Sequence, residues 1–309
     1  MPRASALDRN QSLLERFEER EARRVAAAYN QARREIVDLL ITRWSGSATM
    51  TPGEAAALLR QLGLLEQIDG RLLELEQVLG DIVWGVVTSS TEMAIDQLRR
   101  ELDLLPPTLR PDNVATFGTI NHRMVERFVP VAMGDMRLAT QSLSLTIRRE
   151  LQTGLIQGES FDKLVRRVMA PEATGPGPAV WRNGALSAER AVRRLVITAE
   201  NGAKQESIGE VAKAVPEVQK QAVAVIGQNT TDCCLRVHGQ IQPVSEPFEL
   251  EGTPRFADEM MTPAFHWNCR TSIAMWHPLF ERSGLTTANM RSSAQAELRK
   301  REGKKEGTA

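Results

Sequence analysis

The chain has 309 residues, and its 39 basic and 39 acidic side chains give a formal net charge of zero. This length allows more than one hydrophobic core, and the balanced charge excludes a polybasic surface over the whole chain. Only three cysteines occur, two of them adjacent, which argues against a secreted disulfide framework. The N-terminus lacks an apolar signal segment, and no charge-free run reaches the roughly 18 residues of a membrane span. We therefore expect synthesis in the cytoplasm and no membrane contact.

Helical patterns dominate the first 170 residues. Apolar side chains spaced three and four apart predict one amphipathic helix from about 7 to 44 and a second from about 51 to 105. Pro106 and Pro107 end the second helix, because proline lacks the amide hydrogen that a helix interior needs. Residues 113–151 predict a shorter and a longer helix that separate near Pro130, and a brief amphipathic helix follows Ser160.

The pattern changes after residue 170. Residues 170–189 are rich in Pro, Gly and small side chains, which is typical of a linker or an exposed loop. A helix is predicted from Ser187 to about Pro216, and the β-branched runs beyond it predict three strands. We expect a mostly α-helical N-terminal region (1–170), a linker (171–186), a small α+β C-terminal domain (187–280) and a basic polar tail (281–309).

All three cysteines and two of the four histidines lie in two short runs, DCCLRVHGQIQP from Asp232 and TPAFHWNCRT from Thr262. Two thiolates and two imidazoles form the ligand set of a closed tetrahedral zinc site. The candidate ligands of one structural zinc ion are Cys234, His238, His266 and Cys269. Two other interpretations stay open: buried thiols and hydrogen-bonded imidazoles without a metal, or a cysteine–histidine nucleophile. The chain has no G-x-S-x-G, phosphate-loop or H-E-x-x-H motif, so we expect no enzyme.

The two runs together resemble the phage Mu F-like head-morphogenesis proteins, the minor head or minor capsid proteins of tailed bacteriophages. The resemblance covers about Ser187 to Phe280. Its matching residues in the runs are Asp232, Cys234, Gly239, Ile241, Pro263, His266, Asn268, Cys269 and Arg270. Upstream, its matching residues are Arg190, Ala191, Thr198, Glu200 and Asn201. The chain departs from the family pattern at Thr231 and Thr271, where many relatives have cysteine.

The resemblance implies a virion component of the phage head, assembled in the host cytoplasm. Its implied partners are the portal protein and the major capsid protein, with genomic DNA as a further candidate in packaging or delivery. The helical region 1–170 would then provide the assembly surface. Two alternatives from other classes are a thiol- or metal-dependent enzyme and a DNA-binding adaptor, the second of which depends on the basic C-terminal tail.

Overall fold

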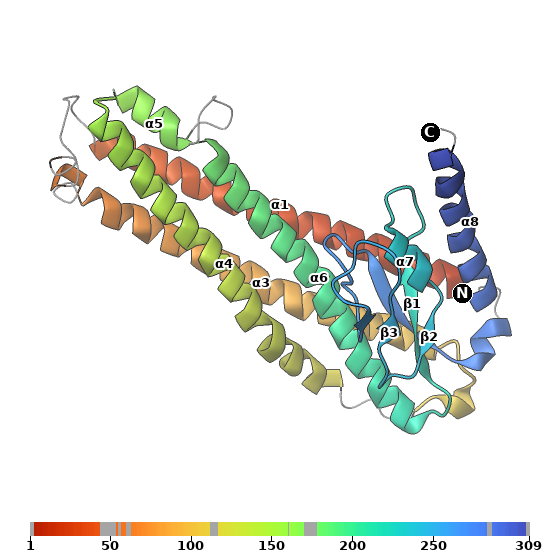
Figure 1. The fold of residues 1–309 in the computed structure, drawn as a ribbon. Helices are drawn as coiled ribbons and strands as arrows, with labels where there is room; N and C mark the ends of the chain where they lie inside the picture. Colours follow the sequence, from red (N-terminus) through yellow and green to blue (C-terminus); the bar gives the residue numbers. More distant parts are fainter. Residues whose placement is uncertain are drawn as a thin grey trace. The chain divides into compact units, whose positions relative to one another are not determined.

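The computed structural model describes residues 3–43, 54, 57–59, 63–111, 117–159, 161–169, 178–282 and 286–306 (Figure 1). The chain divides into two compact units. Unit 1 contains residues 1–19, 85–129 and 193–309, and unit 2 contains residues 20–84 and 130–192. The segments of both units alternate along the chain, so neither unit corresponds to one continuous stretch of sequence.

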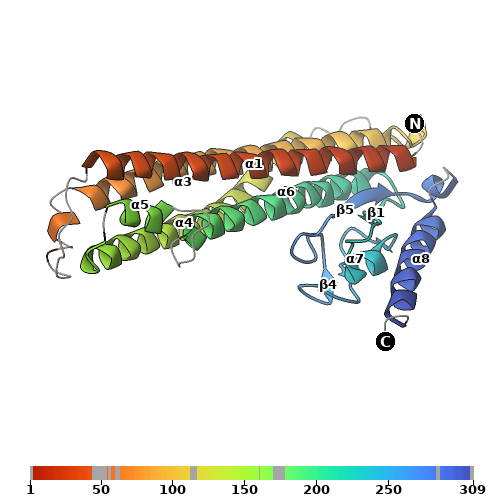
Figure 2. The same cartoon turned by 90° about the horizontal axis from the view of Figure 1, so that it is seen from above.

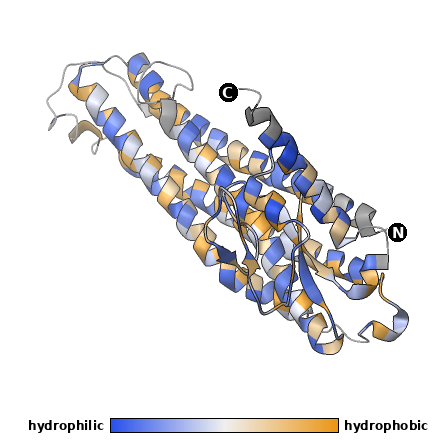
Figure 3. Cartoon of the chain, turned by 45° about the vertical axis from the view of Figure 1, so that its right-hand side comes forward, coloured by the Kyte–Doolittle hydropathy of each residue, from blue (hydrophilic) through white to orange (hydrophobic). Residues whose placement is uncertain are grey.

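Long helices form most of the described chain and confirm the mostly α-helical prediction. They are α1 (Arg3–Arg43), α3 (Leu64–Leu102), α4 (Phe117–Ile156), α5 (Phe161–Met169), α6 (Pro178–Ala214) and α8 (Thr287–Glu306), with short 3₁₀ turns η1 (Pro107–Leu109) and η2 (Pro278–Arg282). Apolar and polar residues alternate around these helices (Figure 3), which is the pattern of helices that bury one face. The start signal predicted at Thr51 and Pro52 lies outside the described residues.

Two sequence predictions differ from the structure. The expected break near Pro130 is absent, since α4 continues through this residue. Buried Met124 and Met136 hold the helix on both sides of the proline, so packing compensates for the lost backbone hydrogen bond. Within the expected linker, residues 178–186 belong to α6, whereas 170–177 lie outside the described part of the chain.

Unit 2 is built by helix packing. Its core comes from α1, α3, α4, α5 and α6, with Tyr29, Ile36, Leu79, Leu151 and Trp181 among the buried side chains. Arg167 of α5 donates to Glu150 (3.0 Å) and Glu159 (2.9 Å), which fixes α5 against the end of α4. By length and composition α3 could cross a membrane, but 50% of its most apolar window is buried inside the protein.

Unit 1 contains the strands. The central strand β1 (Gln219–Ala224) pairs antiparallel with β2 (Ile241–Gln242) and with β5 (Thr271–Trp276). A second ribbon joins β3 (Phe248–Glu249) to β4 (Glu259–Met260). The short helix α7 (Asp232–Val237) packs against β1 and α8. In the three-stranded sheet the order is β2-β1-β5, so β5 is an edge strand. Figure 2 shows β5 alongside α6.

The C-terminal segment, predicted as a basic polar tail, contains helix α8 and buries part of it. Met290 and Ala294 of α8 are buried, and Met290 shares a core cluster with Leu7, Val223 and Ala274. Arg301 donates to the Thr230 carbonyl (2.6 Å) and forms an ion pair with Asp232 (3.2 Å). Helix α8 is therefore a packed part of unit 1.

Candidate functional site

Helix α7 carries the adjacent cysteines and ends at a glycine. Gly239 has φ +78°, a left-handed conformation that glycine adopts without steric cost. A Cβ at this position would lie 3.2 Å from Met290 Cβ, so α8 approaches the backbone closely here. The Gly239 amide donates to the Ala222 carbonyl (2.8 Å). The glycine thus ends α7 and joins it to β1.

The second run forms a turn ahead of β5. Asn268 has φ +60°, a conformation that asparagine tolerates better than most residues. The Cys269 amide donates to the His266 carbonyl (3.3 Å), and β5 begins at Thr271. The asparagine of the motif therefore shapes a turn that directs His266 and Cys269 toward α7.

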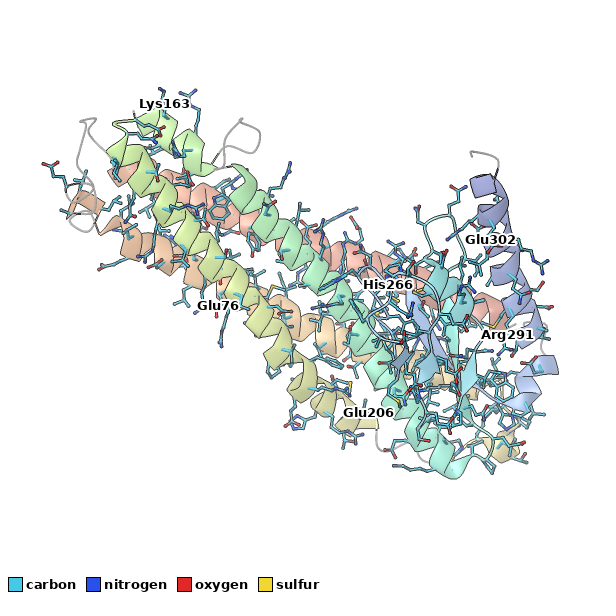
Figure 4. The ribbon with its side chains drawn as sticks, viewed as in Figure 1. Glu76, Lys163, Glu206, His266, Arg291 and Glu302 are labelled. Carbon is cyan, nitrogen blue, oxygen red and sulfur yellow. The ribbon has the colours of Figure 1, made fainter. Side chains whose placement is uncertain are left out.

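A sulfur–nitrogen cluster results where α7 meets this turn. Figure 4 labels its histidine, His266. Cys234 Sγ lies 3.0 Å from His266 Nε2 and 3.8 Å from Cys269 Sγ. Cys233 Sγ lies 4.0 Å from Cys234 Sγ and donates to the Pro254 carbonyl (2.7 Å). The ligand atoms of Cys233, Cys234 and His266 all lie within 4.8 Å of one another. The structure therefore brings together three of the four predicted residues and adds Cys233.

His238 does not join this cluster. Its Nδ1 accepts a hydrogen bond from the Ala224 amide (2.9 Å), so the ring stabilises the end of β1. Burial lowers the pKa of His238 to about 4, because the charged imidazolium would lose its hydration. Sequence spacing alone could not separate this structural histidine from a ligand, since C-x3-H also fits a helical ligand pair.

Electrostatics favour charge separation within the cluster. Hydrogen bonding from Cys234 holds the pKa of the Cys269 thiol well below its usual range, although burial opposes this. Burial acts to lower the pKa of His266, but its interactions with Cys233 and Cys269 outweigh that effect and raise it to about 10. The cluster therefore stabilises a thiolate beside an imidazolium, and thiolate is the form in which cysteine binds metals.

An aromatic pair lies next to the cluster. Trp267 and Phe256 meet edge to face with ring centroids 5.5 Å apart, and the guanidinium of Arg194 lies 4.4 Å above the Trp267 ring. Trp267 nevertheless stays 59% exposed, whereas Cys234 and His266 are 2% and 4% exposed. A substrate could reach this thiol only if the covering residues moved.

A buried polar network joins α6 to β5. Glu200 and Asn201 were noted as motif residues in the sequence, but this structural role was not predicted from it. The Asn201 side chain accepts from the Ile273 amide (2.7 Å) and donates to the Thr271 carbonyl (3.3 Å). It thereby satisfies the free edge of β5 as a neighbouring strand would. Glu101 of α3 accepts from the Met275 amide (2.8 Å) farther along the same edge.

The same network contains a buried ion pair. Lys204 pairs with Glu200 and donates to Ser272 Oγ (2.6 Å). Burial raises the pKa of Glu200, while the Lys204 charge and hydrogen bonds oppose the shift. The adjacent Glu200 and Asn201, with Lys204 four residues after the glutamate, are the signal that could have identified this helix as the partner of a strand edge.

Comparison with known families agrees with the motifs. Residues 145–274 match the family model described as Phage Mu protein F like protein. The match begins within α4, earlier than the motifs indicated, and ends within β5 after the cysteine–histidine cluster. No curated protein and no solved structure matches the chain significantly. The resemblance predicted from the two runs is thus confirmed.

Proposed function

From the Mu F-like region at residues 145–274, a region typical of phage head morphogenesis, we infer that this protein is a minor head protein of a tailed bacteriophage. It acts at or near the portal vertex, where it contacts the portal protein and the major capsid protein. The observation that carries this proposal is the family match, which includes both the motif turn and α6. The protein becomes part of the phage head after assembly in the host cytoplasm.

Support for an assembly role comes from an exposed apolar stripe on α4 in unit 2. Val131, Leu138 and Leu145 are exposed by 66%, 67% and 68%, and they follow one another at seven-residue spacing. Side chains at that spacing lie on one face of a helix, as in the seam of a coiled coil. Contiguous exposed apolar surface on a folded protein is typical of interaction sites. We assign this stripe to the contact with the portal protein.

The enzyme alternative is disfavoured by burial. A cysteine–histidine pair at 3.0 Å has the spacing of a nucleophile and its base. Both side chains are more than nine-tenths buried, so neither presents a reactive atom to a substrate. We therefore assign the cluster a structural role and the protein a non-enzymatic one.

Genomic DNA is a second candidate partner. Arg291, Arg299 and Lys300 of α8 are exposed and cationic, which suits contact with phosphates. Such binding would weaken steeply as the salt concentration rises, because phosphate contacts release counterions. A DNA-binding adaptor would bind duplex DNA without the portal protein.

The assembly proposal is tested by co-expressing the full chain with the portal protein of the same phage. Leu138→Lys should abolish co-purification while changing the free energy of unfolding by less than about 0.5 kcal/mol, as expected of an exposed position. Gln31→Lys adds the same charge at an exposed position on α1 of unit 2, where a lysine can still meet Glu35, and should co-purify like the unaltered chain. Equal co-purification of both variants would contradict the assigned surface.

A further inference from the structure

We propose that the cluster at α7 binds one structural Zn²⁺ ion per chain. Its ligands would be Cys233, Cys234, His266 and Cys269. This ligand set replaces His238, the histidine indicated by sequence spacing, with Cys233, the first of the two adjacent cysteines. The proposal is independent of the head-assembly function, since it concerns only the chemistry and stability of unit 1.

Two of the sulfur–sulfur separations fit tetrahedral zinc. With Zn–S bonds of about 2.3 Å, two sulfur ligands of one tetrahedral ion lie about 3.8 Å apart. Cys234 Sγ lies 3.8 Å from Cys269 Sγ and 4.0 Å from Cys233 Sγ. Among the described residues, the group whose ligand atoms all lie within 4.8 Å of one another contains Cys233, Cys234 and His266 but not Cys269. Cys234 is therefore the central ligand, and the Cys269 side chain must move toward this group to complete the four ligands around a bound ion.

The hydrogen bonding of His266 prepares one nitrogen for a metal. Nδ1 lies 2.5 Å from the Trp267 carbonyl oxygen, which can only accept, so Nδ1 carries the proton. Nε2 faces the Cys234 sulfur at 3.0 Å. Metal-bound histidines usually donate their other ring nitrogen to a carbonyl or carboxylate in this way, which fixes the ring orientation. The Trp267 carbonyl would serve as that outer partner.

The surroundings favour a structural ion over a catalytic one. Four protein ligands fill a tetrahedral site and leave no position for water or substrate. The side chains come from two segments, α7 and the turn before β5, whose cysteine residues are all buried. A bound ion would therefore join α7 to the start of β5. The soft thiolate ligands favour zinc over magnesium or calcium, which prefer oxygen.

Metal content of the full-length chain tests the proposal directly. Protein purified under reducing conditions without a chelator should contain about one zinc ion per chain. After removal of the zinc, added Co²⁺ should give the sulfur-to-cobalt charge-transfer absorption and the strong visible bands of a tetrahedral thiolate site. Folded, reduced protein that holds no zinc and gives no such cobalt spectrum would overturn the proposal.

Substitutions assign the ligands. Cys233→Ser, Cys234→Ser, Cys269→Ser and His266→Gln should each weaken zinc binding by at least tenfold, whereas His238→Gln should bind zinc like the unaltered chain. Circular dichroism checks that each variant folds, and the cobalt spectrum of the unaltered chain tests the site even if a variant does not. Unchanged zinc affinity in a ligand variant, or lost binding in folded His238→Gln protein, would overturn this ligand set.

Discussion

The buried polar side chains of the described residues lie mostly in unit 1, whereas unit 2 buries few, among them Glu21 and Glu150. Unit 2 packs apolar faces of helices and leaves Val131, Leu138 and Leu145 exposed on α4. Unit 1 buries Glu200, Lys204 and other polar groups around its three-stranded sheet. A helix satisfies its own backbone hydrogen bonds, whereas a short sheet leaves an edge that other groups must satisfy. The polar core of unit 1 is therefore a consequence of its strands.

The contrast also shows where each unit would tolerate change. Apolar helix packing in unit 2 depends on volume and burial, so its exposed positions are free to serve a partner. In unit 1, residues distant in sequence meet at one strand, as Glu101 and Asn201 do at the edge of β5. Loss of one such group leaves a buried polar atom unpaired. Unit 1 should therefore be the more sensitive of the two.

The largest expected effect is loss of folding in a fragment of residues 187–309. Unit 1 also needs residues 1–19 and 85–129, which supply Leu7 to its core and Glu101 to the β5 edge. Without them, β5 loses the partner of its Met275 amide and the sheet loses apolar cover. We expect the fragment to be insoluble or to melt without a cooperative transition, as measured by circular dichroism.

A two-fragment control tests whether the fragment fails to fold because it lacks residues 1–19 and 85–129 of unit 1. Residues 117–309 co-expressed with residues 1–111 contain every described part of unit 1, with the break falling between η1 and α4. This pair should recover cooperative melting. If residues 187–309 alone melted cooperatively near the temperature of the full chain, the C-terminal α+β region would be an independent domain.

The next largest effect concerns the buried ion pair. Lys204→Met leaves the Glu200 carboxylate buried without its cation, and breaking such a pair costs about 3–5 kcal/mol of unfolding free energy. The double variant Glu200→Gln with Lys204→Met removes both charges and should recover most of this loss. Urea unfolding of the three proteins measures the difference. Equal stability of the single variant and the unaltered chain would show that the pair contributes nothing.

Much of this fold could be predicted from the sequence, because helix periodicity and strand runs are local signals. The runs around Cys234 and Cys269 also revealed where the site would lie. The identity of the fourth cluster member could not be predicted, since Cys233 and His238 are both compatible with the spacing and only the path of β1 separates them. The helix break predicted near Pro130 was wrong for a related reason. The tertiary packing that holds a helix on both sides of a proline cannot be read from the neighbouring sequence.

The smallest predicted effect is a pH dependence that assigns His238. Its pKa in the folded chain is about 4, below the value of roughly 6.5 for an unperturbed histidine. Because the unfolded chain binds the proton more readily, His238 contributes stability that is fully present above about pH 6.5 and is lost as the pH falls toward 4. Between pH 7.5 and 5 the loss should be about 2 kcal/mol of unfolding free energy. Glutamine does not titrate, so the free energy of unfolding of His238→Gln should fall by about 2 kcal/mol less than that of the unaltered chain over the same pH range. Parallel pH profiles of the two proteins, measured by urea unfolding, would show that His238 is accessible to protons in the folded state.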